Sequence, residues 1–547
     1  MEGISQTILE LTRSYLVDAS RESELAEILA SRDPVRLVTS RSLFSAVPLA
    51  LVHYALSGLE ARLYRGARWL DARGLSMSLE AFALGAGEGT LAGAIAAAGL
   101  SPQCVAVSLP GSGLVLADAK RARELAAAIA RAFAKATGET LAVGVEELWP
   151  DEALLGRSPD LVRPPRFGVL AEAIHGRLTT AARAAAPAGL ACLPGFLERC
   201  AACRAAPASH DAEPGERHPE RLCELCHTRR ELARTQPEAP APHLEQAFEL
   251  SETERERHEE QAGQVALIGA ALDGLGELLM GLGGIDQVAL THKAIAAALD
   301  GAVSELVEKL GLRRRWQRHA SAPGEVWLLV PASRALDGVR RLVEGAEAGL
   351  SREAEALGGY PEIQEGLRRM RLSVGLAFAP STYGPALVAE LARALVASAR
   401  RLSLRAGPLA PPTSTVDFWV LADGQPHSTA MDELRHHVYE TRRDARLTRR
   451  PYVYADFKHD VIEPLRAFRR LPRADVADLR RQLLADPRAA DLNLRYHVAR
   501  SDEWRAFAVE VAGMDPARWE TLLFRAGPEG ARETSFVDLA ELAEFHD

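Results

Sequence analysis

Four cysteines constrain the fold of this 547-residue chain more than any other feature of its sequence. They form two Cys-x-x-Cys pairs, Cys200 with Cys203 and Cys223 with Cys226, separated by a polar segment rich in proline, histidine and glutamate. Each pair can form a knuckle, and four soft thiolates at this spacing favour one tetrahedral Zn²⁺ over a redox site or chance. Because four sulfurs fill the coordination shell of zinc, the predicted ion is structural and not catalytic.

Composition and charge narrow the class of protein. The chain has 47% apolar and 25% charged residues, so most of it should fold, and its length allows roughly three to four domains. A net charge of -9 means that any nucleic-acid contact must come from local basic patches. The chain has neither a secretory-signal pattern nor a run of about 18 uncharged apolar residues. We therefore expect a cytoplasmic protein with no membrane partner.

Residues 33–150 predict a β-α-β-β-α-β unit. Its hairpin turn contains Pro110 and Gly111, a strong turn signal because proline presets φ and glycine allows positive φ. The predicted elements are a strand at 34–40, a packing helix within 46–70, a hairpin at 103–118, a helix at 119–138 and a strand at 140–145.

Residues 262–427 predict the same order of elements. The hairpin turn and the closing strand of the two units agree in register, which favours internal duplication over chance likeness between two α/β units. The predicted elements are a strand at 264–274, a helix at 287–310, a hairpin around Pro323-Gly324, helical stretches at 334–370, a strand at 371–380 and a helix at 384–402.

The predicted fold class is α+β, with two ferredoxin-like (βαββαβ) palm domains, a zinc-binding module between them and a C-terminal helical domain. The predicted boundaries are 1–32 for an N-terminal helix, 33–190 for the first palm, 191–260 for the four-cysteine module and linker, 261–428 for the second palm and 429–547 for the helical domain.

This arrangement resembles the large subunit of type III CRISPR effector complexes, the CRISPR polymerase family related to GGDEF cyclases. The resemblance covers about residues 33–470. It depends on the order of domains, the strand IGAALDGLG (268–276), the strand LSVGLAFAP (372–380) and the segment LTRRPY (447–452), which is similar to a threonine, arginine, proline, tyrosine signature that follows the second palm in family members.

The resemblance implies a metal site in the second palm, and here the sequence departs from the family. Members that make cyclic oligoadenylate carry Asp-x-Asp-Gly and Gly-Gly-Asp-Asp, whereas this chain has Ala271-Leu272-Asp273-Gly274 and Ala322-Pro323-Gly324-Glu325. Asp273 and Glu325, the residual candidates, are a poor ligand set for two Mg²⁺ ions. The first palm has only Gly111-Ser112-Gly113, which is the family norm for that copy. We therefore predict no catalytic residues, and Mg²⁺ and ATP as cofactors only if the chain is an active cyclase.

A second departure concerns the HD nuclease domain with which many family members begin. The first 52 residues contain no histidine, so this nuclease is predicted to be absent. The His-Asp dipeptides elsewhere, at His210, His459 and His546, stand in the wrong contexts and are attributed to chance.

Residues 435–473 form the best local candidate for RNA contact. Eleven Lys or Arg residues stand against five acids and alternate with aromatic residues, which suits phosphate contact and base stacking. A solvated helix face with structural aromatics is an equally weighted alternative. The candidate RNA-contacting residues are Arg442, Arg443, Arg446, Arg449, Arg450 and Tyr452.

The resemblance and its departures together predict a structural large subunit of a type III-like CRISPR effector complex. Its partners would be guide (CRISPR) RNA, target RNA and other effector subunits in antiviral defence, and it would lack cyclase activity. One alternative is a nucleotidyl cyclase that makes cyclic oligoadenylate with Asp273 and Glu325 as a minimal metal pair. Another is a standalone sensor that binds a purine nucleotide without turnover.

Overall fold

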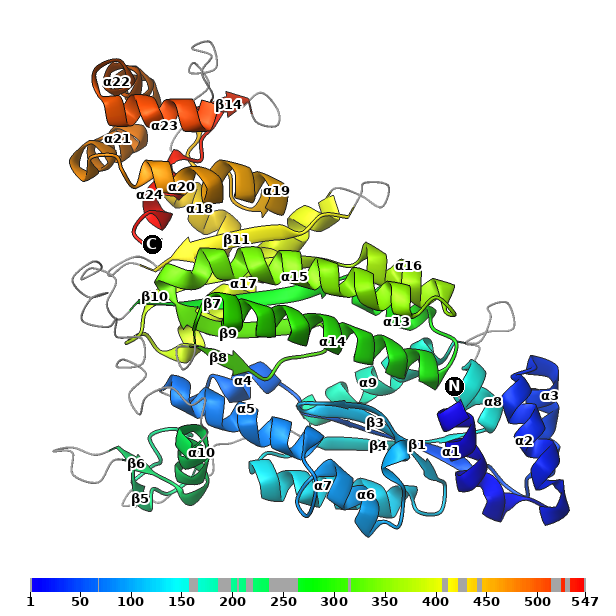
Figure 1. Ribbon diagram of the computed structural model, residues 1–547. Helices are drawn as coiled ribbons and strands as arrows, with labels where there is room; N and C mark the ends of the chain where they lie inside the picture. The colour runs from blue at the N-terminus through cyan, green and yellow to red at the C-terminus, as the bar shows by residue number, and fades with distance from the viewer. Residues whose placement is uncertain are drawn as a thin grey trace.

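The computed structural model describes most of the chain (Figure 1). The described residues are 2–66, 68–156, 166–184, 198–203, 206–212, 220–235, 264–312, 316–405, 412–421, 430–439, 445–512, 523–526 and 532–545. Among the helices of these segments, none is both long and apolar enough to cross a membrane.

A four-stranded antiparallel sheet forms the first half of the fold, with strand order β2-β3-β1-β4. All seven residues of the central strand β1 are buried, so its continuous apolar sequence is that of a core strand. The elements of this half are β1 (Leu49–Ala55), α4 (Leu59–Leu63), α5 (Trp69–Leu84), α6 (Leu91–Ala97), β2 (Val105–Leu109), β3 (Ser112–Asp118), α7 (Ala122–Thr137), β4 (Ala142–Leu148), α8 (Pro150–Leu155) and α9 (Phe167–Ala184).

The start of this half differs from the sequence prediction. The predicted strand at 34–40 is the helix α3 (Pro34–Thr39), because the Asp33 carboxylate accepts hydrogen bonds from the first-turn N–H groups and Pro34 occupies the first helical position. The predicted helix within 46–70 contains β1 and the short helix α4 instead. The N-terminal region is therefore built from several helices, which include α1 (Glu2–Thr12), α2 (Glu22–Ser31) and α3.

A six-stranded sheet forms the second half, with strand order β13-β11-β10-β7-β9-β8. Its strands β10-β7-β9-β8 repeat the order β4-β1-β3-β2 of the first sheet, and the helices fall at the same places in the chain. The elements are β7 (Gln264–Asp273), α13 (Leu275–Gly281), α14 (Ile285–Lys309), β8 (Gln317–His319), β9 (Glu325–Pro331), α15 (Ala335–Ala356), α16 (Pro361–Arg369), β10 (Arg371–Pro380), α17 (Pro385–Arg405), β11 (Thr415–Val420) and β13 (Tyr452–Val453).

Helices cover both faces of the second sheet. A Cβ on Gly375 of β10 would lie 2.5 Å from the Ala392 carbonyl oxygen of α17, so α17 packs directly on that face. A Cβ on Gly338 of α15 would lie 3.2 Å from Ile268 of β7. Because Ile268 pairs with the residue after Gly375 and strand side chains alternate, α15 and α17 lie on opposite faces.

The two halves pack against each other reciprocally. Helix α5 of the first half contacts β8 of the second, and α14 of the second half contacts β2 of the first. Figure 1 shows the blue and cyan half along one side of the green half, with α5 and α14 between the sheets.

The C-terminal region is mostly helical and lies beyond β11 (Figure 1). It also contains a small sheet in the order β12-β15-β14, which the sequence did not predict. Its elements are α18 (Met431–Tyr439), β12 (Ala445–Arg446), α19 (Tyr454–Phe457), a π-helical turn (Lys458–Ile462), α20 (Glu463–Phe468), α21 (Arg473–Ala485), α22 (Pro487–Arg500), α23 (Asp502–Ala512), β14 (Arg525–Ala526), β15 (Arg532–Glu533) and α24 (Phe536–Leu542).

Candidate metal centre and candidate active site

The four predicted cysteines converge on one point. The sulfur atoms of Cys200, Cys203, Cys223 and Cys226 all lie within 4.8 Å of one another, and those of Cys203 and Cys223 are 3.8 Å apart. A tetrahedral ion with Zn–S bonds of about 2.3 Å requires sulfur separations of about 3.8 Å. The donor set and its spacing therefore fit a four-coordinate metal ion.

Short local elements position these sulfurs. The N–H of Cys203 faces the Cys200 sulfur at 3.5 Å, the contact typical of a knuckle. The second pair stands at the start of α10 (Glu224–Thr235), after the hairpin of β5 (His210–Asp211) and β6 (Arg221–Leu222). We refer to this unit, 198–235, as the cysteine module.

Buried ion pairs attach the cysteine module to the first half. Arg230 is 1% exposed at its side chain and pairs with Asp71 of α5 at 2.6 Å. Arg229 pairs with Glu139 at 3.0 Å. The backbones also come close, because a Cβ on Gly74 of α5 would lie 2.5 Å from the Arg229 carbonyl oxygen. Few other residues fit at position 74, so module and helix pack as one body.

Asp273, the residual carboxylate at the end of β7, already has partners. Its side chain accepts a hydrogen bond from the Ser373 hydroxyl at 2.7 Å and forms an ion pair with Arg400 of α17 at 3.1 Å. Burial raises the pKa of Asp273, and the hydrogen bond from Ser373 and the charge of Arg400 oppose that rise. The Asp273 carboxylate is therefore already paired with a cation and a hydroxyl.

Glu325, the second residual carboxylate, stands at the start of β9 opposite Ala271 of β7. It accepts a hydrogen bond from the indole N–H of Trp327 at 3.1 Å. Its charge also contributes to a raised pKa of Glu60 in α4, for which burial is the larger cause. Glu60 in turn pairs with Arg393 of α17 at 2.6 Å. The face that carries Asp273 and Glu325 thus meets two arginines of α17.

The first half has an equivalent of this turn that the sequence analysis did not identify. The N–H of Leu56 donates to the Gly111 carbonyl at 2.7 Å, and the N–H of Leu272 donates to the Gly324 carbonyl at 2.9 Å. This register aligns Ala55-Leu56-Ser57-Gly58 with Ala271-Leu272-Asp273-Gly274, with a positive-φ glycine at the end of each. The first half therefore has Ser57 where the second has Asp273.

A cavity of about 360 Å³ lies between the two halves, next to both hairpin turns. Pro110 of the first turn and Pro323 of the second are among its lining residues. Arg318 pairs there with Asp300 of α14 at 2.6 Å. Burial raises the pKa of Glu80 in α5, which also lines this cavity. The cavity is thus lined by positively and negatively charged side chains on otherwise apolar walls.

Buried histidine makes the contact between the halves sensitive to acid. His319 of β8 is fully buried, its Nδ1 lies 2.8 Å from the Tyr64 hydroxyl, and its pKa is lowered to about 3 by burial and by the charge of Arg73. The unfolded chain binds this proton near pH 6.5, so stability present above that pH is lost as the pH falls. We expect about 2 kcal/mol lost at pH 5. Denaturant titrations at pH 7 and pH 5 should show a smaller loss in His319→Gln; an unchanged loss would contradict this prediction.

The structure separates the six candidate RNA-contacting residues. Arg442 and Arg443 lie outside the described residues. Arg446 is exposed and pairs with Glu533 at 3.3 Å, whereas Arg449 is partly buried and pairs with Asp460. The last two candidates, at positions 450 and 452, are buried.

The side chains of Arg450 and Tyr452 hold helix α24 against the rest of the C-terminal region. The Arg450 side chain has no exposed surface and pairs with Asp538 at 2.9 Å and Glu541 at 3.2 Å. The Tyr452 hydroxyl also donates to Asp538. These two side chains face the interior and not solvent, which is neither the RNA-facing surface nor the solvated helix face that the sequence suggested. Their partners are distant in the sequence, which is why the basic pattern misled.

Comparison with known proteins gives a fold and no sequence family. No protein-family model matches the chain, and no curated protein matches it. The crystal structure of Csm1 in T. onnurineus matches 96% of this chain and 73% of its own at 13% identity, with a TM-score of 0.50. An apo Csm1–Csm4 cassette matches 96% and 74% at 13% identity and a TM-score of 0.49. A Csm1–Csm4 subcomplex of the type III-A CRISPR-Csm interference complex matches 90% and 74% at 12% identity and a TM-score of 0.47.

The fold is therefore similar to that of Csm1, and at 13% identity the likeness concerns the fold alone. The resemblance expected from the sequence is confirmed at that level.

Proposed function

We propose that this chain is the structural large subunit of a type III-like CRISPR RNA-guided effector complex, without cyclase activity. The support is the Csm1 fold over 96% of the chain together with the state of the face that carries Asp273 and Glu325. In this proposal the two sheets are palm domains, the cysteine module holds structural Zn²⁺, and the C-terminal region is a helical domain. Guide RNA, target RNA and other effector subunits are the partners.

The observation that carries the noncatalytic part is the ion pair between Asp273 and Arg400. Two-metal phosphoryl chemistry needs several carboxylate oxygens around two Mg²⁺ ions about 3.5 to 4 Å apart. Ala271 supplies no ligand, Asp273 already neutralises a guanidinium, and Glu325 is the only further acid of the two motifs. A palm with these residues keeps its fold but has too little negative charge left to bind two metal ions.

We expect no oligoadenylate from the purified complex supplied with ATP, Mg²⁺, guide RNA and target RNA. Thin-layer or mass-spectrometric analysis of the products measures this directly. A product that disappears on Glu325→Ala would establish the cyclase alternative and refute the noncatalytic proposal.

The scaffold role has its own test. Purification from the native host, mass spectrometry of the co-purifying proteins and sequencing of the bound RNA should yield short RNAs with repeat-derived ends. A chain that purifies alone and free of RNA would contradict the role.

A second candidate function is nucleotide binding without turnover, which the 360 Å³ cavity between the halves favours. Its volume suits a small ligand, and Arg318, which now pairs with Asp300, is a cation that phosphate could bind in place of that carboxylate. Calorimetry with ATP on the wild type and on Arg318→Gln tests it: binding that the substitution weakens supports it, and no heat of binding excludes it.

A further inference from the structure

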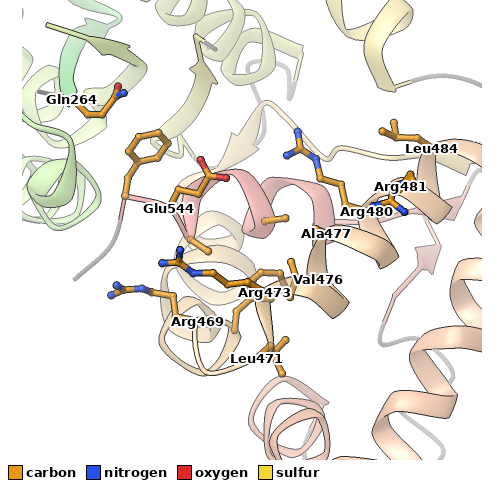
Figure 2. Close-up of a pocket in the computed structure, with 14 residues that line it drawn as sticks. Gln264, Arg469, Leu471, Arg473, Val476, Ala477, Arg480, Arg481, Leu484 and Glu544 are labelled. Atoms are coloured by element: carbon orange, nitrogen blue, oxygen red, sulfur yellow. The ribbon is translucent and has the colours of Figure 1, made fainter. Parts of the chain in front are cut away.

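A larger cavity, of about 600 Å³, lies where the C-terminal helices meet the end of the central strand β7 of the second sheet. The end of α20, the helix α21 and the residues after α24 form its walls, and Gln264 at the start of β7 closes one side (Figure 2). It shares no lining residue with the cavity between the halves. Any ligand here is therefore separate from the Asp273 and Glu325 face.

The cavity has an excess of positive charge. Its lining residues that the structure describes include the single carboxylate Glu544 and four arginines: Arg469, Arg473, Arg480 and Arg481. In Figure 2 the guanidinium groups of Arg469 and Arg473 lie on the same side of the cavity. Such an excess favours an anionic ligand.

The arginines differ in how far they are already neutralised. Arg480 pairs with Glu541 of α24 at 3.2 Å, and Arg481 pairs with Asp478 one turn earlier at 3.0 Å. Within the described part of the chain, the Arg469 guanidinium has no hydrogen bond or ion pair. Arg469 is therefore the side chain most able to bind a new anion.

The start of α21 adds to this attraction. Helix α21 begins at Arg473 on the cavity wall, and its N-cap residue Pro472 provides no side-chain hydrogen bond. The first turn also carries Asp475, whose carboxylate accepts from the indole N–H of Trp504 at 3.3 Å and does not line the cavity. First-turn N–H groups without a cap carry the partial positive charge of a helix N-terminus. Arg469, Arg473 and this first turn together resemble the arrangement that proteins use to hold phosphate.

The rest of the wall is apolar and firmly packed. Leu471, Val476 and Leu484 contribute aliphatic surface to the cavity. Phe545 stacks on Phe378 of β10 with ring centroids 4.7 Å apart, so this residue after α24 packs against the sheet. A preformed cavity of this size, with apolar walls and a cationic side, suits a ligand with a phosphate and a planar or apolar part.

We propose that this cavity binds a phosphate monoester of about nucleotide size. The phosphate lies against Arg469, Arg473 and the first turn of α21, and the apolar part packs on Leu471 and Val476. Either a free nucleotide or the 5′-phosphorylated end of an RNA offers this chemistry. The proposal is independent of the scaffold role and of nucleotide binding between the halves.

Calorimetry on the full chain tests the site with AMP and with a 5′-phosphorylated RNA dinucleotide, each beside its unphosphorylated form. We expect the phosphorylated probes to bind at least about tenfold more tightly, since a hydrogen bond to a charged group contributes about 1.5 to 3 kcal/mol. Arg469→Gln should weaken binding by a similar factor. Glu544→Gln should strengthen it, because it removes the carboxylate that lines the cavity among the described residues.

Two matched variants make the result specific. Arg470→Gln removes the neighbouring exposed arginine, which does not line the cavity, and should leave the affinity unchanged. Arg318→Gln alters the other cavity and should also have no effect.

Tighter binding of AMP identifies a free nucleotide, and tighter binding of the dinucleotide identifies an RNA end. Three results would overturn the proposal: neither phosphorylated probe binds, phosphate makes no difference, or a matched variant loses as much affinity as Arg469→Gln.

Discussion

Replacement of Cys203 by serine should remove the metal ion and unfold the cysteine module. Structural zinc contributes on the order of 10 kcal/mol to the folding of small zinc domains, and three remaining sulfurs cannot complete the tetrahedral shell. We expect zinc content, measured by elemental mass spectrometry, to fall from one ion per chain to none. Hydrogen exchange should accelerate throughout α10.

The loss should spread into the first half, because the module and α5 pack as one body. Once α10 unfolds, Asp71 loses its buried partner Arg230, whereas Glu139 loses Arg229 and keeps Arg62 and Arg65. Because Asp71 belongs to α5 and loses its cation, exchange in α5 should accelerate as well. Cys104→Ser is the matched control: Cys104 is buried outside the cluster, so this variant should keep its zinc. Wild-type zinc content in Cys203→Ser would contradict the metal assignment.

The cysteine cluster could be predicted from the sequence because its information is local. Two knuckles bring their own ligands together, and the pairs need only a short hairpin between them. Strands β7 and β10 of the second sheet were predicted almost residue for residue for a related reason, whereas β11 and β13 were not predicted. Strands β7 and β10 are long apolar runs, each bounded by clear turn or helix signals, and they pair along their whole length.

The first sheet shows where such reasoning fails. Its central strand β1 lies in an apolar stretch whose spacing also suits a helix, and periodicity alone cannot separate the two for short runs. The repeat of Ala-Leu-Ser-Gly at 55–58 and Ala-Leu-Asp-Gly at 271–274 would have located it. When the strands of the two halves are aligned, only the second half has an acid, Asp273, at this turn, and the first half has Ser57 there.

Ion pairs between segments that are distant in the sequence could not be predicted, for a different reason. The basic stretch at 435–473 predicted a surface, but its partners Asp538 and Glu541 stand near the end of the chain. Arg450, a candidate for RNA contact by its sequence, is buried and holds α24 in place through these two ion pairs. The arginines around the 600 Å³ cavity are the converse case, because only the fold brings α20, α21 and the residues after α24 to one place.

Replacement of Arg450 by methionine should destabilise the C-terminal region by about 3 to 5 kcal/mol, because it leaves Asp538 buried without its cation and Glu541 with Arg480 alone. Burial already raises the pKa of Asp538, and the charge of Arg450 is the largest effect that opposes the rise. Hydrogen exchange in α24 measures the local cost.

Arg446→Met is the matched control for this loss. Arg446 stands four residues earlier, is 47% exposed at its side chain and pairs with Glu533 at 3.3 Å, so its removal should cost no more than about 1 kcal/mol. The double variant Arg450→Met, Asp538→Asn should recover part of the stability, because it removes the stranded charge together with its partner. Equal exchange in α24 for Arg450→Met and Arg446→Met would show that Arg450 does not anchor this helix, and residues 447–452 would again be open to a role in RNA contact.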